Sequence, residues 1–177
     1  MGNPDTIKKV IEIVKEDLNK NENIVVVFSA FQTITNLLIS TGELASVGNE
    51  EYKLAFSQIK NIHLTAIEKL TDGDILRKTR TKVFKLLDDL EKLIYGISLI
   101  KELSPRSRDH LMSYGERLSC TIITGAFINC GIKAEFLDSR KVVKTDDNFG
   151  NARVNFQLSN QLIKEHFEGV NNLQVVC

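Results

Sequence analysis

The most informative segment of the sequence reads Ile24-Val25-Val26-Val27-Phe28, with Ser29-Ala30 directly after it. Its five apolar residues do not alternate with polar ones, a pattern typical of a parallel strand buried on both faces. Amphipathic helical patterns lie on both sides, over residues 4–18 before it and over residues 35–39, ending near Gly42, after it. The order helix, strand, helix predicts an α/β domain in which helices flank a mostly parallel sheet.

Two long helical patterns occupy the middle of the chain. The first places apolar residues at helical spacing from Tyr52 to Leu70, and the second does so from Val83 to Ile100. Each would extend about 30 Å at roughly 1.5 Å per residue, and Asp72-Gly73-Asp74 separates them. We expect an antiparallel helical hairpin that packs on itself and on the domain body. A coiled coil that binds a partner is the alternative interpretation.

A third long helix is predicted from Ser104-Pro105 to Cys130, because a serine cap followed by proline is a typical helix start and Gly131 is a typical helix end. Its small residues permit close approach of a neighbouring backbone, and they are Gly115, Ser119, Gly125 and Ala126. Beyond this helix the patterns predict a strand at 134–137, a β-hairpin of 141–144 with 152–155, a short helix at 160–167 and a strand at 173–176.

Composition narrows the class of protein. The 177 residues include 23 basic and 23 acidic side chains, so the chain lacks the basic excess of a general nucleic-acid binder. It has neither an apolar run long enough to cross a bilayer nor a signal-peptide pattern at its start. Its three cysteines show no metal-type spacing, which indicates reduced thiols and no metal site. Cys120 and Cys130 lie ten residues apart on one predicted helix, and we expect both to be buried small apolar residues. We therefore expect one cytoplasmic domain without nucleic-acid or membrane partners.

Three segments of the sequence occur in an order and at a spacing that carry a family resemblance. They are Val25-Val26-Val27-Phe28-Ser29-Ala30 with Ile34-Thr35-Asn36-Leu37-Leu38, then Ser113-Tyr114-Gly115-Glu116-Arg117-Leu118-Ser119, then Asp138-Ser139-Arg140-Lys141-Val142-Val143-Lys144-Thr145-Asp146-Asp147-Asn148-Phe149-Gly150. Together they resemble aspartokinase, the amino-acid kinase that phosphorylates aspartate. The resemblance implies a partial amino-acid-kinase fold over residues 1–177, with the helical hairpin as an insertion at about 48–102.

The sequence also departs from the aspartokinase pattern. Family members begin with a strand and a Lys-Phe-Gly-Gly-Thr-Ser motif, whose lysine contacts the transferring phosphoryl group. Further on they have a Gly-Arg-Gly-Gly-Ser-Asp segment, an ATP-binding half and paired regulatory ACT domains. None of these motifs occurs in this sequence. We therefore expect the aspartate-binding portion of a catalytic domain that lacks most elements for the co-substrate MgATP, keeps no catalytic residue of the family and is inactive alone.

By resemblance, three residues of this sequence bind the substrate L-aspartate: Ser29, Thr35 and Glu116. The residues alone leave other roles open. Ser29 could end a strand and cap the next helix, and Thr35 could bond to the backbone at a helix terminus. Glu116 could lie on a solvated face beside Arg117. By resemblance its cationic partner would instead be the ammonium group of aspartate, or the lysine that is missing here.

Two functions therefore follow from the sequence as hypotheses. The first is aspartate kinase, a phosphotransferase that moves a phosphoryl group from ATP to the β-carboxylate of L-aspartate, for lysine, threonine and methionine synthesis. The alternative is a non-catalytic amino-acid-binding or assembly module derived from an aspartokinase. Because a sheet with unpaired edges tends to pair with another chain, we also expect self-association.

Overall fold

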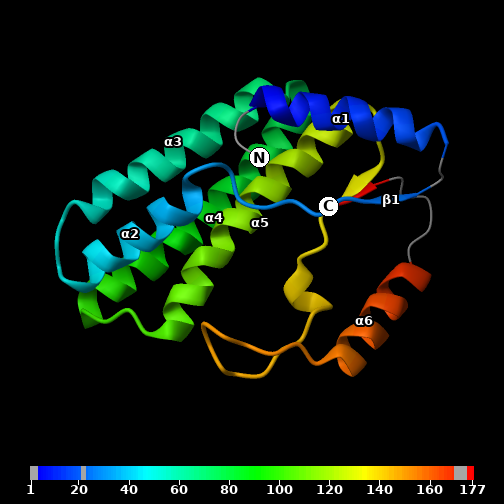
Figure 1. Ribbon diagram of the computed structural model, residues 1–177. Coiled ribbons are helices and arrows are strands. Elements are labelled where there is room, and N and C mark those ends of the chain that lie inside the picture. The colour runs from blue at the N-terminus through cyan, green and yellow to red at the C-terminus, as the bar shows by residue number, and fades with distance from the viewer. Residues whose placement is uncertain (1–3, 21–22, 170–174) are drawn as a thin grey trace.

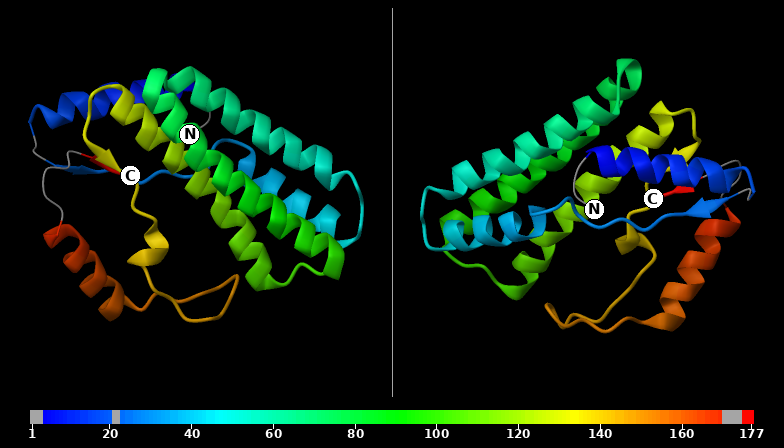
Figure 2. Two further views of the ribbon diagram at one scale, coloured as in Figure 1. Left: turned by 180° about the vertical axis from the view of Figure 1, so that it is seen from behind. Right: turned by 45° about the horizontal axis from the view of Figure 1, so that its top comes forward.

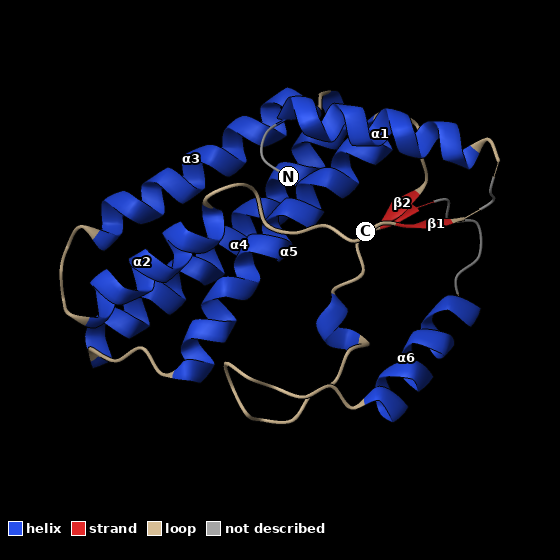
Figure 3. Cartoon of the chain, in the orientation of Figure 1, coloured by secondary structure: helices blue, strands red, loops and turns tan. Residues whose placement is uncertain are grey.

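The structure, a computed structural model, describes residues 4–20, 23–169 and 175–177. The helices are α1 (Pro4–Leu18), α2 (Ile34–Ser46), α3 (Tyr52–Leu70), α4 (Gly73–Ile100), α5 (Pro105–Asn129) and α6 (Phe156–Glu168), the strands are β1 (Ile24–Val25), β2 (Ala134–Glu135) and β3 (Val175–Val176), and η1 (Ser139–Lys141) is a 3₁₀ turn. The described chain is mostly helical, with a small sheet at one end of the helices (Figures 1 and 3). Within these ranges no helix has the length and apolar character needed to span a membrane.

The sheet is parallel, as the sequence predicts. Its strand order is β1-β3-β2, and Val175 of the central strand is in register with Ile24 on one side and with Ala134 on the other. The Val26 N–H donates to the Val176 carbonyl at 2.8 Å and extends the first ladder by one bond. The strands are shorter than the predicted segments 24–28 and 134–137, and residues 173–174 of the last prediction lie outside the described residues.

The prediction that the first strand is buried on both faces is wrong for this structure. Side chains along 24–28 alternate, because Phe28 is 6% exposed whereas Val25 and Val27 are 59% and 89% exposed. The Phe28 ring lies 6.3 Å from that of Phe127 in α5. The inward face of the strand thus packs on the helices, and no element in the described ranges covers the outward face.

Helices α2, α3, α4 and α5 pack against one another as a bundle (Figures 1 and 2). The predicted hairpin of α3 and α4 is confirmed, and it packs on both α2 and α5. Every residue of α5 from Leu118 to Phe127 is buried. A helix enclosed on all sides needs small residues where its neighbours approach, which explains the small residues of this stretch.

Helix boundaries were predictable where a cap residue marks them. Ser104 caps α5 by accepting a hydrogen bond from the Ser107 N–H at 3.2 Å, as the Ser–Pro signal predicts. By contrast α2 continues through Gly42, the predicted end. A Cβ at this glycine would lie 2.5 Å from Cδ2 of Leu111, so Gly42 permits helix packing and does not end the helix.

The predicted hairpin of 141–144 with 152–155 is also corrected. Within residues 139–155, all of them described, one antiparallel bridge joins Thr145 to Val154. The 3₁₀ turn η1 includes Lys141, the first residue of the first predicted strand. The Asp138 carboxylate accepts from the Arg140 N–H at 3.2 Å and so starts the 3₁₀ turn. A side chain that captures the backbone in this way competes with strand pairing.

Helix α6 begins four residues before the predicted start at 160, because the Asn155 side chain caps it by accepting from the Leu158 N–H at 3.1 Å. It stands apart from helices α2–α5 in every view (Figures 1 and 2). Ser159 of α6 joins this helix to the segment after η1, because its hydroxyl accepts a hydrogen bond from the Lys144 N–H at 2.9 Å.

The buried side chain of His63, in α3, packs against the segment that follows β1. The Nδ1 atom of His63 is 2.7 Å from the Ile59 carbonyl, and its ring stacks on Phe31 with 5.4 Å between centroids. Its Nε2 is buried without a hydrogen-bond partner in the described chain. Burial lowers the pKa of His63 to about 4, so the folded protein holds this imidazole neutral.

We expect the stability of the protein to fall in mild acid because of His63. Its pKa is about 4 when folded against 6.5 for the free side chain, so below pH 6.5 the unfolded chain binds the proton more readily. Stability is therefore complete above this value and is lost as the pH falls toward 4. Between pH 7 and pH 5 the unfolding free energy should drop by about 2 kcal/mol, measured by urea denaturation. A His63→Phe variant should lose most of this drop, and an unchanged pH dependence would contradict the assignment.

Candidate functional site

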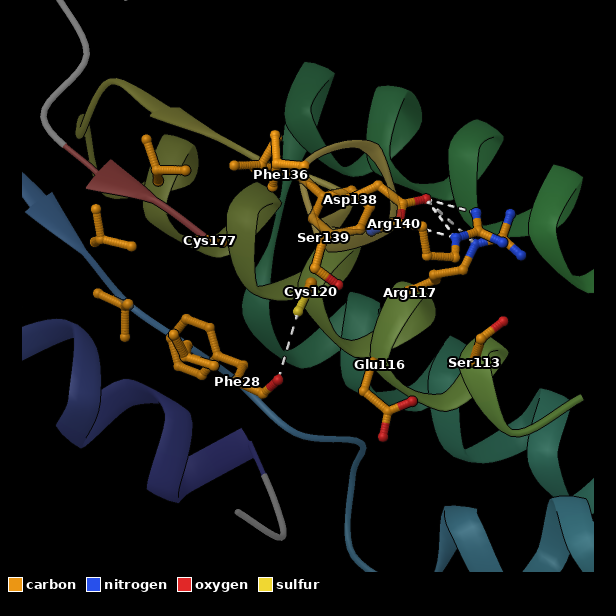
Figure 4. Close-up of a pocket in the computed structure, with 16 residues that line it drawn as sticks. Phe28, Ser113, Glu116, Arg117, Cys120, Phe136, Asp138, Ser139, Arg140 and Cys177 are labelled. Carbon is orange, nitrogen blue, oxygen red and sulfur yellow. Dashed lines mark hydrogen bonds and ion pairs between the residues drawn. The ribbon is translucent and has the colours of Figure 1, made fainter. Parts of the chain in front are cut away.

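A cavity of about 400 Å³ lies where the carboxyl ends of the three strands meet α5. Its walls are residues 25–28 after and within β1, residues 136–140 after β2, and Val176-Cys177 at the end of β3. Helix α5 supplies Ser113, Glu116, Arg117 and Cys120 (Figure 4). Open α/β sheets bind ligands at the carboxyl ends of their strands, and this cavity is therefore the candidate site.

One side of the cavity holds a cluster of three charges. The Asp138 carboxylate accepts hydrogen bonds from the Arg140 guanidinium, from Nη2 at 2.6 Å and from Nε at 2.9 Å, besides the one from the Arg140 backbone N–H. It also lies 3.9 Å from Nε of Arg117, whose guanidinium stacks 4.4 Å from the Tyr114 ring centroid. The hydrogen bonds from Arg140 lower the pKa of Asp138. The cluster therefore stays ionised, with one positive charge in excess.

Another part of the cavity is apolar and carries two thiols. Cys120 and Cys177 are both buried. Burial raises the pKa of Cys120 to about 12 and that of Cys177 to about 11, so neither is a thiolate nucleophile at neutral pH. The prediction that Cys120 is a buried apolar residue is confirmed, whereas the same prediction for Cys130 is wrong because Cys130 is exposed.

Glu116 contributes a carboxylate without a partner in the part of the chain that the structure describes. It is half-buried, and within the described ranges its carboxylate makes neither a hydrogen bond nor an ion pair. Figure 4 shows its side chain apart from the Asp138–Arg140 pair. A half-buried carboxylate without a cation is a natural position for an ammonium group of a ligand.

Ser29 and Thr35 do not line this cavity. The Ser29 side chain is exposed, and its carbonyl accepts from the Ser119 hydroxyl at 2.9 Å. The same hydroxyl is 3.0 Å from the carbonyl of Glu116, so Ser119 joins the segment after β1 to the helical turn that carries Glu116. Thr35 is half-buried in the first turn of α2. The structure thus brings the Ser29 backbone next to the Glu116 turn without enclosing all three side chains in one cavity.

Gly115 allows this close approach. A Cβ at this position would lie 2.9 Å from Cβ of Ala30, 3.3 Å from Cδ1 of Leu38 and 3.4 Å from Cγ2 of Ile34. The Ala30 Cβ is fixed to the backbone and cannot rotate away. The prediction that the small residues of this helix permit close backbone approach is therefore confirmed here.

We expect Gly115→Ala to displace the segment between β1 and α2. Because Ala30 cannot yield, the backbone at 29–35 has to move away from α5, at a cost of about 1–2 kcal/mol in unfolding free energy. Urea denaturation measures the loss, and amide chemical shifts report the movement. Unchanged shifts at Ser29 and Ala30, with full stability, would contradict the close contact.

Sequence reasoning did not assign a contact at the site to Asp138 or Arg140. The available signal was local, since aspartate two residues before arginine at the start of a turn predicts a side-chain cap. The contact of Asp138 with Arg117 joins segments far apart in the sequence and has no local signature.

Comparison with known proteins agrees with this architecture. The profile of the Amino acid kinase family matches residues 1–177, and the chain belongs to this family. Among individual relatives it is 34% identical to chloroplastic aspartokinase 1 of Arabidopsis thaliana over 131 residues, which are 71% of this chain and 22% of that protein. It is 30% identical to lysine-sensitive aspartokinase 3 of Escherichia coli over 153 residues, 84% of this chain and 31% of that protein.

Two solved structures of E. coli aspartokinase III match the fold. The complex with aspartate and ADP, in the R-state, gives a TM-score of 0.84 at 26% identity and covers 99% of this chain and 37% of that one. The complex with lysine and aspartate, in the T-state, gives a TM-score of 0.86 at 27% identity over the same shares. The chain thus spans about a third or less of these relatives, and the predicted resemblance and fold class are confirmed.

Proposed function

We propose that this chain is the aspartate-binding portion of an aspartate kinase catalytic domain. The supporting observation is the likeness, over 99% of the chain, to an aspartokinase solved with aspartate and ADP. The carboxylate of Glu116, which has no partner among the described residues, lies in the cavity at the carboxyl ends of the strands and agrees with this proposal. The helical insertion at 48–102 and the cytoplasmic location expected from the sequence belong to the same proposal.

In the proposed reaction this portion of the enzyme has to position the substrate and does not have to remove a proton from it. The β-carboxylate of aspartate, with a free pKa of about 3.9, is already ionised at neutral pH, so no general base is needed. We assign to Glu116 the ammonium group of the substrate. Ser29 and Thr35, whose side chains lie outside the cavity, would donate hydrogen bonds to its carboxylates only if the substrate extends beyond the cavity, and this part of the assignment rests on the family resemblance. These contacts would hold the β-carboxylate in line for attack on the terminal phosphorus of ATP.

We expect most of the residues that bind MgATP to lie outside this portion of the catalytic domain. Within the described ranges no group of three histidine, cysteine, aspartate or glutamate side chains could hold a metal ion. The lysine and glycine motif that would stabilise the transferring phosphoryl group is absent from the sequence. We therefore assign no step to MgATP here and expect the 177-residue chain alone to bind aspartate without turnover.

Isothermal titration calorimetry with L-aspartate tests the substrate assignment. Succinate, which lacks the ammonium group, and L-asparagine, which lacks the β-carboxylate, should both bind at least about tenfold more weakly. Equal binding of all three ligands, or none, would contradict the proposed function. A coupled assay for ADP release with aspartate and MgATP tests inactivity separately, and turnover by the chain would overturn that part only.

A second candidate, an assembly module, is favoured by the uncovered face of β1. Val25 and Val27 are 59% and 89% exposed on this face, and exposed apolar strand surface promotes association between chains. Sedimentation velocity should then show a concentration-dependent shift toward a dimer or larger species. A monodisperse monomer at high concentration would count against self-association.

A further inference from the structure

A second cavity of about 400 Å³, separate from the candidate site, lies between α4, α5 and β2. Lys78, Thr79 and Lys82 of α4 form one wall, and Thr121 of α5 with Glu135 of β2 belongs to the other. The Phe136 ring lines both this groove and the first cavity. The volume is sufficient for a small metabolite, and neither the proposed function nor the family resemblance uses this groove.

The α4 wall carries two lysines, Lys78 and Lys82, in a basic stretch of the helix. Residues 77–85 contain five basic side chains and no acidic one, in a chain whose formal net charge is zero. Lys78 and Lys82 lie one helical turn apart and therefore project from the same face. In the described part of the chain neither lysine makes an ion pair, whereas Arg77 on the same helix pairs with Asp74. Two adjacent positive charges on one wall of a concave surface attract an anion to that wall.

The opposite wall offers hydrogen-bond acceptors. The Thr121 hydroxyl donates to the Arg117 carbonyl and the Thr124 hydroxyl donates to the Cys120 carbonyl, each at 2.7 Å. Both protons are used in the helix. The Thr124 side chain also hydrogen-bonds the Cys177 thiol, so Thr121 provides the hydroxyl oxygen that can accept from a ligand. The exposed carboxylate of Glu135 adds a further acceptor on this side.

We infer that this groove binds a small molecule with an anionic group at one end and a hydrogen-bond donor, an ammonium or a hydroxyl, at the other. The anion lies against Lys78 and Lys82, and the donor lies against Thr121 and Glu135. Between the two walls, Phe136 and other apolar side chains contact a short carbon chain. A ligand with only one of the two groups satisfies only one wall and binds more weakly.

Nuclear magnetic resonance titration of the chain with four probes tests this inference. Phosphoethanolamine and β-alanine carry both groups, and the tighter of the two identifies the anion as phosphate or carboxylate. Inorganic phosphate carries only the anion, and ethanolamine carries only the donor. At least one of the two-ended probes should bind saturably and shift the amide of Gly125, which lines the groove, with phosphate weaker and ethanolamine weakest. No saturable shift at Gly125 with any probe, or shifts confined to the Glu116 cavity, would overturn the inference.

Two sets of variants test the two walls separately. Lys78→Gln with Lys82→Gln should weaken the two-ended probe by roughly tenfold, since each exposed charge contributes up to about 1 kcal/mol. Arg77→Gln with Lys85→Gln removes the same charge from the same helix outside the groove and should change binding less than about twofold. Thr121→Val should weaken the two-ended probe and leave phosphate unchanged. Equal losses in the two double variants, or an equal effect of Thr121→Val on both probes, would overturn the assignment.

Discussion

Replacing Glu116 with glutamine is expected to weaken the binding of L-aspartate about 100-fold. Glutamine keeps the shape of the side chain but removes the charge opposite the substrate ammonium. Within the described ranges the Glu116 carboxylate has no protein cation, so the substitution breaks no internal ion pair and should leave the fold intact. Calorimetric titration with aspartate measures the loss, and urea denaturation confirms that the variant is folded.

The specificity of the variant distinguishes a direct contact from a general electrostatic effect. If Glu116 binds the ammonium group, Glu116→Gln should bind aspartate and succinate almost equally, because succinate lacks only that group. Glu102→Gln removes the same charge from an exposed position in the α4–α5 connection, and it should leave aspartate binding within about twofold. Aspartate binding by Glu116→Gln at the wild-type level would remove Glu116 from the site.

The helices show what the sequence could predict. The bounds of α1 and α3 agree with the predicted 4–18 and 52–70, because long amphipathic repeats depend on local spacing. The burial of β1 was mispredicted for a different reason. A run of apolar residues shows that a strand tolerates burial, but the covering element determines whether a face is buried. The structure covers one face of this strand, and Val27 on the other is exposed.

The candidate site also contains one residue that was predicted from the sequence and a cluster that was not. Glu116 was predicted from the resemblance of the contiguous segment 113–119. The structure places it in the cavity, and its contact with a ligand stays a prediction. The ion-pair cluster of Arg117, Asp138 and Arg140 was not identified, since it depends on how η1 folds back onto α5. The roles of Gly42 and Gly115 in helix packing could not be predicted from the sequence. Both lie within helices, where the sequence does not reveal which side chain approaches them.

The packing of α4 on α5 leads to the other large expected effect, at Gly125. A Cβ added to Gly125 would lie 2.9 Å from Cγ2 and 3.2 Å from Cβ of Thr79, with Oγ1 of that threonine closer still. Rotation about χ1 cannot clear both γ atoms, because only the single hydrogen on the Thr79 Cβ can replace one of them, and the other position facing Gly125 then still holds Oγ1 or Cγ2. The two helices must therefore separate, and Gly125→Ala should lower the unfolding free energy by about 3 kcal/mol.

A double-mutant cycle with Thr79→Ala tests that cause. Removal of the threonine γ atoms makes room for the new methyl group, so Gly125→Ala with Thr79→Ala should be more stable than Gly125→Ala alone, with a coupling of about 1–2 kcal/mol in urea denaturation. Gly96→Ala is the matched control, because an added Cβ there meets no atom within 4 Å. It should stabilise α4 by about 0.5–1 kcal/mol, the ordinary preference of a helix interior for alanine over glycine. A cycle without coupling, or equal losses from Gly96→Ala and Gly125→Ala, would show that the α4–α5 contact does not limit the size of residue 125.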